Sequence, residues 1–114
     1  MHEVGIAQDL IEQVERRLAE VKEPIKTLKI SVLLGQLAGV SPEALQFGFE
    51  VAKRESKISF AQLEIVEIPL KLSCPYCQHS YHSAEIQITC PICSKGPLEV
   101  RAGKELRVDS LEYE

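Results

Sequence analysis

Apolar residues recur at three- and four-residue steps near the start of the chain. They run from Val4 through Leu10 and Val14 to Val21, and mostly polar and charged residues fill the intervening positions. This spacing predicts a helix with one buried face over about residues 4–21. A second helix is expected to begin after Ser41, because Ser-Pro-Glu supplies a capping hydroxyl, a ring with helical φ and a carboxylate at the positive end.

Alternating apolar and polar residues predict strands elsewhere in the chain. Residues 28–32 alternate with one face apolar, and Leu33 and Leu34 extend this strand toward burial on both faces. Residues 63–72 contain two alternating runs. Pro69 cannot donate to a central ladder, so the chain should leave its sheet there. Residues 105–111 predict a last strand, and residues 85–89 predict a short one between two cysteine pairs.

The predicted order is helix, strand, helix, strand, cysteine module, strand. It favours an α+β fold in which two helices cover a three-stranded sheet, because each strand must bury one face. A zinc-ribbon-like module is inserted before the last strand. We expect residues 1–69 and 102–114 to form an α/β domain, and residues 70–101 to form the inserted domain.

The four cysteines form two matched pairs, CPYC and CPIC, separated by twelve residues. Two residues between thiolates let both sulfurs of a tight turn face one ion, while backbone N–H groups point at the sulfurs. Two such turns complete a tetrahedron, and zinc would stabilise a module too small for its own core. The pattern predicts a structural zinc site with these ligands: Cys74, Cys77, Cys90 and Cys93.

Other chemistry remains open at these cysteines. Four thiolates also accept iron, which would make an electron-transfer protein. Disulfides or a redox CxxC are less consistent with two matched pairs in a chain expected in a reducing compartment. His79 or His82 could exchange with a cysteine as ligand, or could simply be exposed.

Composition narrows the function. The chain has 114 residues, a net charge of −4 and a pI near 5.4, which disfavour binding to a phosphate backbone. It has no apolar run long enough for a membrane helix and no secretory signal pattern, so we expect a cytoplasmic protein. Neither a catalytic triad nor a phosphate-cradling loop is visible, which argues against an enzyme.

The first residues offer a second metal site. A bulky second residue should keep Met1 in place, which brings together the Met1 α-amine, the His2 amide and the His2 imidazole. Three nitrogens on one short segment can form fused chelate rings, and planar nitrogen coordination favours Ni(II) or Cu(II) over zinc. From spacing alone, a solvated histidine without a metal remains the simpler interpretation.

Four sequence features stand out: Met1-His2-Glu3 at the N-terminus, the segment GVSPEALQFGFE at 39–50, the paired CxxC motifs, and ELRVDSLE at 105–112. Together they resemble the HypA/HybF family of nickel metallochaperones. The resemblance spans essentially the whole chain. It implies a nickel-binding α/β domain with an inserted zinc domain, and delivery of nickel to the large-subunit precursor of [NiFe]-hydrogenase. It also implies the maturation GTPase HypB as a partner and, in some organisms, urease maturation factors.

By the same resemblance, Met1, His2 and Glu3 correspond to the nickel motif, and the four cysteines correspond to the zinc ligands. Glu3 either contacts the nickel or complements the first turn of the helix. Some relatives carry a histidine directly after the fourth cysteine, where this chain has Ser94. A histidine-switched zinc site is therefore in doubt, and His79 is the nearer alternate ligand. A zinc-ribbon adaptor that uses no nickel is the main rival function.

Overall fold

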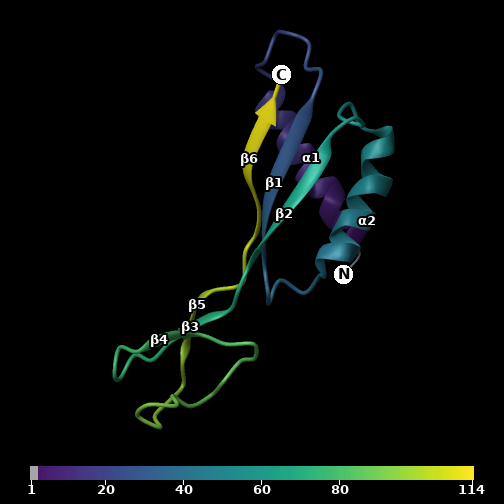
Figure 1. Ribbon diagram of the computed structural model, residues 1–114. Helices are drawn as coiled ribbons and strands as arrows, with labels where there is room; N and C mark the ends of the chain where they lie inside the picture. Colours follow the sequence, from purple (N-terminus) through teal and green to yellow (C-terminus); the bar gives the residue numbers. More distant parts are fainter. Residues whose placement is uncertain (1–2) are drawn as a thin grey trace. The chain divides into compact units, whose positions relative to one another are not determined.

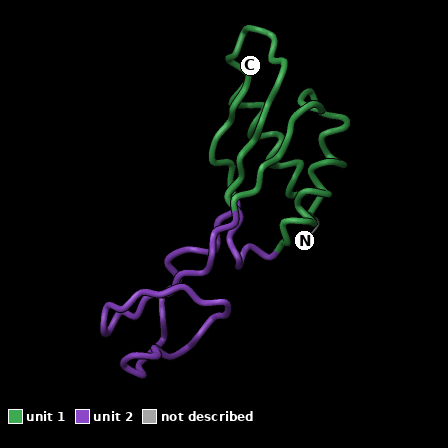
Figure 2. The backbone as a smooth tube through the Cα atoms, viewed as in Figure 1, with its two compact units in different colours: residues 1–33, 40–66, 107–114 green, residues 34–39, 67–106 purple. Residues whose placement is uncertain are grey.

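The computed structural model describes residues 3–114. The chain divides into two compact units, which Figure 2 colours separately. Unit 1 comprises residues 1–33, 40–66 and 107–114, and unit 2 comprises residues 34–39 and 67–106. Within the described part of the chain, no helix has the length and apolar character needed to cross a membrane.

Unit 1 contains both α-helices and most of a three-stranded sheet, whose order is β2-β1-β6 (Figure 1). The elements of this part are α1 (Glu3–Leu18), β1 (Leu28–Gly35), α2 (Pro42–Ala52), the 3-10 helix η1 (Lys53–Glu55), β2 (Gln62–Ile68) and β6 (Leu106–Tyr113). The predicted α+β class, with two helices and three strands in one sheet, is confirmed.

The two neighbours of β1 run in opposite directions. Near the start of β1, Lys29 forms an ion pair with Glu64 of β2 at 2.5 Å, and just beyond its end the Gln36 N–H donates to the Ile68 carbonyl at 3.0 Å. β2 is therefore parallel to β1, as a helical crossover through α2 requires. β6 is antiparallel, since the Glu114 N–H donates to the Thr27 carbonyl at 3.2 Å, where β6 ends and β1 begins.

The core of unit 1 lies between the helices and one face of the sheet. Helix α1 buries the face that its apolar spacing predicts, although the helix ends at Leu18 rather than near residue 21. On β1, Leu28, Ile30 and Val32 are buried while Lys29 is exposed. The prediction that one face of this strand is buried is therefore confirmed.

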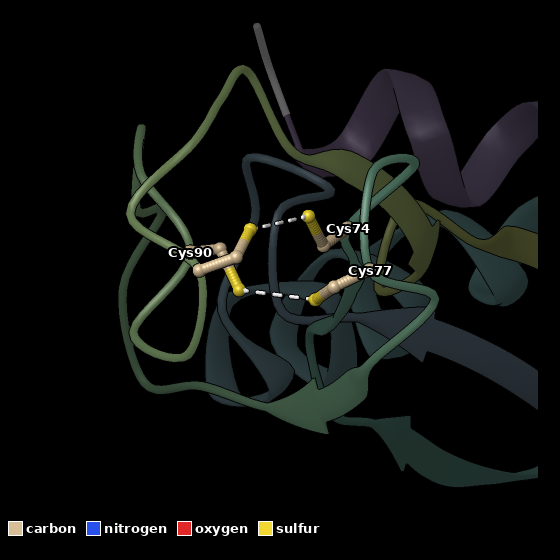
Figure 3. A group of neighbouring side chains, drawn as sticks. Cys74, Cys77 and Cys90 are labelled. Atoms are coloured by element: carbon tan, nitrogen blue, oxygen red, sulfur yellow. Dashed lines mark hydrogen bonds between the residues drawn. The ribbon is translucent and has the colours of Figure 1, made fainter.

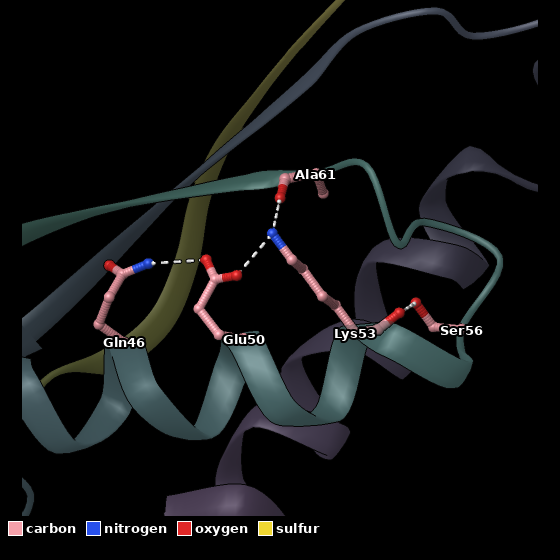
Figure 4. A network of polar contacts seen from close by, with 5 residues as sticks. All are labelled: Gln46, Glu50, Lys53, Ser56 and Ala61. Atoms are coloured by element: carbon pink, nitrogen blue, oxygen red, sulfur yellow. Dashed lines mark hydrogen bonds and ion pairs between the residues drawn. The ribbon is translucent and has the colours of Figure 1, made fainter.

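Polar contacts fix both ends of α2. The Ser41 Oγ accepts a hydrogen bond from the Ala44 N–H at 3.1 Å, which confirms the predicted N-cap. At the other end, the Lys53 Nζ lies 2.9 Å from the Glu50 Oε2 and donates to the Ala61 carbonyl at 2.9 Å (Figure 4). Because Ala61 directly precedes β2, these contacts connect the end of the helix to the start of the strand.

Unit 2 contains a second, smaller sheet of order β4-β3-β5, in which β3 pairs antiparallel with both neighbours. Its strands are β3 (Lys71–Ser73), β4 (Ser80–His82) and β5 (Glu99–Ala102). β2 ends at Ile68 and β3 begins at Lys71, so the predicted break at Pro69 is confirmed. The strand predicted over residues 85–89 is wrong: Ile86 and Ile88 are 60% and 76% exposed and belong to no strand.

Residues 34–39 belong to unit 2 although they follow β1 in sequence. The Gln36 Oε1 accepts from the Leu70 N–H at 3.1 Å, and its Nε2 donates to the Ala84 carbonyl at 2.5 Å. The Leu37 N–H donates to the Gly103 carbonyl at 2.7 Å. Residues 34–39 therefore form hydrogen bonds to three separate parts of the longer segment of unit 2, residues 67–106.

Candidate metal centre

The two cysteine pairs form two turns with the same backbone. In the first, the Gln78 N–H donates to the Cys74 carbonyl at 2.9 Å, and in the second the Ser94 N–H donates to the Cys90 carbonyl at 2.9 Å. Gln78 and Ser94 occupy the same place after the second cysteine and have φ of 68° and 63°. Each turn therefore reverses the chain through a left-handed residue and directs both of its sulfurs to the same side.

The four sulfur atoms lie within 4.8 Å of one another (Figure 3). The Cys74 and Cys93 sulfurs are 3.5 Å apart, and the Cys77 and Cys90 sulfurs are 3.7 Å apart. A regular zinc tetrahedron with Zn–S bonds of about 2.3 Å has S···S distances of about 3.8 Å, whereas a disulfide bond is about 2.05 Å long. The donor set and its spacing fit a tetrahedral divalent ion such as zinc.

The protein environment prepares some of these thiols to ionise. Burial opposes ionisation of Cys74, but N–H groups of Cys77 and Tyr76 and the neighbouring thiols outweigh it and lower the pKa of Cys74 to about 7. The Cys93 and Ile92 N–H groups similarly lower the pKa of Cys90 against the effect of burial. Both of these lowered pKa values belong to the first cysteine of a turn.

Cys77 has the opposite tendency. The N–H of His79 lowers its pKa, but burial and hydrogen bonding with the other three thiols raise the pKa to about 11. The cluster thus resists carrying four negative charges when only protons are present. A bound divalent cation would offset that repulsion and favour the fully ionised set.

Side chains around the cysteines connect the two turns. The Lys95 ammonium of the second turn lies 5.7 Å from the centre of the Tyr76 ring in the first turn. His79 stacks on Tyr81 with ring centres 5.7 Å apart, and its carbonyl accepts from the Cys74 N–H at 2.9 Å. Among the described residues, the group of ligand atoms that gathers here consists of the four cysteines and does not include His79.

The second predicted site is the nickel motif formed by Met1, His2 and Glu3, and the structure describes only Glu3. Met1 and His2 lie outside the described residues. Glu3 is the first residue of α1 and is half-buried. Sequence reasoning missed two features near these sites. One is the pair of left-handed residues Gln78 and Ser94, which the repeated CPxC-x pattern could have indicated. The other is Gly48, where a Cβ atom would overlap backbone atoms of Glu3 and Val4.

The fold and the four-cysteine cluster together define a small α+β metal-binding protein. The family model described as "Hydrogenase/urease nickel incorporation, metallochaperone, hypA" matches residues 1–113. The chain belongs to this family of nickel metallochaperones, which act in hydrogenase maturation.

Curated relatives and solved structures agree with this assignment. The chain is 36% identical to "Guanidine hydrolase-activating protein A" of Synechocystis sp., over 99% of this chain and 95% of the relative. It is 35% identical to "Hydrogenase maturation factor HypA" of Albidiferax ferrireducens over the full length of both. The solution structure of the nickel metallochaperone HypA from Helicobacter pylori has a TM-score of 0.68 at 26% identity, and covers 99% of this chain and 97% of that one.

Proposed function

We propose that this chain captures Ni(II) at its N-terminus and delivers it to a nickel enzyme. The ligands would be the Met1 α-amine and the amide and imidazole nitrogens of His2, with Glu3 either beside the ion or complementing the first turn of α1. The family match over residues 1–113, together with a sequence that starts Met-His-Glu, carries this proposal. Because α1 begins at Glu3, the proposed ligands are joined directly to a well-packed helix.

The four cysteines would hold zinc and stabilise unit 2, with His79 as an alternate ligand. In this scheme residues 1–69 and 102–114 form the nickel-binding domain, and residues 70–101 form the zinc-binding domain. The protein would act in the cytoplasm by binding and transfer rather than by turnover. Its proposed partners are HypB, which would supply nucleotide energy, and the large-subunit precursor of [NiFe]-hydrogenase.

The test is a calorimetric nickel titration of untagged wild-type protein and of His2→Ala, with zinc content measured in both. We expect His2→Ala to lose at least about tenfold in nickel affinity, equivalent to about 1.4 kcal/mol, with unchanged zinc content. His82→Ala is the matched control, because His82 lies in β4 outside the proposed nickel motif. Its nickel affinity should equal that of the wild type.

Two further conditions probe the same ligands. Nickel affinity should fall on acidification, because imidazole binds a metal only in its neutral form. A residue added before Met1 should also weaken binding, because the free α-amine is lost. Equal affinity in wild type and His2→Ala would remove the N-terminal site, and would leave a zinc-stabilised adaptor as the better interpretation.

A second candidate concerns the enzyme that is served. The 36% identical relative from Synechocystis is named as an activator of guanidine hydrolase, not of hydrogenase. Co-expression of this chain with either apo-enzyme, followed by measurement of nickel content and activity, separates the two. If only the hydrolase gains activity, and His2→Ala abolishes the gain, guanidine hydrolase is the client.

A further inference from the structure

Gly48 lies in the middle of α2 and is buried against the first residues of α1. A Cβ atom at position 48 would be 2.6 Å from the Glu3 oxygen, 2.7 Å from the Glu3 carbonyl carbon and 3.0 Å from the Val4 nitrogen. All three are backbone atoms, so no side-chain rotation can relieve the overlap. Any larger residue at position 48 must move one of the two helices or the first turn of α1.

The first turn is the part that would move. Further along α1, Ala7 and Val14 are fully buried, and on α2 Leu45 and Phe49 are 0% and 1% exposed on either side of Gly48. Separating the helices would expose these side chains and open cavities. Shifting the backbone at Glu3, where α1 begins, disturbs only the end of the helix.

The close contact has a consequence for the nickel ligands. The Glu3 peptide is the point at which the chain enters α1, and Met1 and His2 are joined directly to it. Fused chelate rings require their nitrogens in one plane, and a constraint on the adjacent peptide limits the directions that the ligand segment can take. Because glycine has no Cβ, the backbone of α2 at position 48 can approach the Glu3 peptide closely enough to constrain it.

We propose that Gly48 is a positioning residue for nickel capture: the backbone of α2 at Gly48 holds the Glu3 peptide of α1 and so orients the Met1–His2 ligands. This inference rests on the proposed function. Gly48 itself supplies no ligand, and its effect on nickel passes through the Glu3 backbone.

The chain contains a matched control in Gly5. Gly5 lies in the first turn of α1, close in sequence to Glu3, but a Cβ there would meet nothing within 4 Å. Alanine favours the helix over glycine at both positions, so Gly5→Ala and Gly48→Ala share that effect. They differ in the overlap with Glu3, which only the second creates.

The experiment is a nickel titration of the untagged, zinc-loaded wild type, Gly48→Ala, Gly5→Ala and His2→Ala. We expect Gly48→Ala to weaken nickel binding by at least about tenfold and to alter the visible absorption of bound nickel, while Gly5→Ala stays within about twofold. Helical circular dichroism and zinc content should remain those of the wild type in both variants. Wild-type affinity in Gly48→Ala would overturn the proposal.

The result for His2→Ala distinguishes failure of the proposed function from failure of the role of Gly48. If His2→Ala binds nickel normally, the proposed function fails; if His2→Ala loses nickel and Gly48→Ala does not, only the role of Gly48 fails. Should Gly48→Ala not fold, amide NMR spectra of the wild type decide the matter. Nickel should shift or broaden the Gly48 amide signal together with those of Val4 and Gly5, and an unaffected Gly48 signal would refute the proposal.

Discussion

Removing the zinc that we propose for the four cysteines should unfold unit 2 and leave unit 1 folded. The buried apolar side chains of unit 2 are few: Leu34, Leu70, Leu72 and the ligands Cys74 and Cys90. Unit 1 instead buries both helices against its sheet. The two units therefore differ in what keeps them folded.

The magnitude follows from these side chains. Three buried leucines contribute roughly 4.5–9 kcal/mol in total, at about 1.5–3 kcal/mol each. Structural zinc in small modules contributes about 10–16 kcal/mol near neutral pH. The metal is thus the larger contribution, and the leucines alone would not offset the loss of conformational freedom in the long turns around the cysteines.

Hydrogen exchange, read residue by residue before and after chelation, tests this. Amides of β3, β4 and the two cysteine turns should lose protection, whereas those of α1 and α2 should retain it. A reductant is required throughout, because the Cys74 and Cys93 sulfurs are only 3.5 Å apart and could oxidise to a disulfide that restores the loop. Persistent protection of β3 in zinc-free, reduced protein would contradict the reasoning.

Three further predictions address the core, a turn and the thiols. Phe49→Ala should destabilise unit 1 by about 3–5 kcal/mol in urea unfolding monitored by helical signal, while Phe47→Ala, 61% exposed on the same helix, should cost under about 0.5 kcal/mol. Ser94 has φ of 63°, a left-handed conformation that glycine adopts without the steric cost of a Cβ. Ser94→Gly should therefore stabilise the metal-bound module by about 1 kcal/mol in chelator competition, and a loss of stability would contradict this. Because zinc binds thiolates and acid protonates them, chelator competition should find weaker zinc binding at about pH 6 than at about pH 8, and equal affinity at both would contradict this.

The fold was predictable where local pattern and tertiary packing agree. The helix at residues 3–18 and the strand at residues 28–35 bury the faces that their periodicity indicates. The alternation around Ile86 and Ile88 failed because a strand needs a hydrogen-bonding neighbour, and β3 already pairs with β4 and β5. β5 was not predicted, since its pairing with β3 bridges distant parts of the sequence.

The candidate metal centre was predictable in its residues and less so in its surroundings. The spacing of the cysteine pairs indicates a cluster, and the four sulfurs do gather. Sequence did not reveal that Cys74 and Cys90 are buried and have lowered pKa values, because N–H contacts and burial depend on the folded turns. It also did not single out Gly48, because a glycine inside a helical pattern gives no sign of a close backbone neighbour.

The hydrogen bonds of Gln36 also bear on how such proteins can exchange parts during evolution. A recombination event or a designed chimera that replaces residues 67–106 alone would pair a foreign module with the native residues 34–39, which contact Ile68, Leu70 and Ala84. The incoming module would then have to accept an amide side chain at position 36. The two segments should therefore be inherited together, and transplants that move both should express better than transplants that move only the longer one.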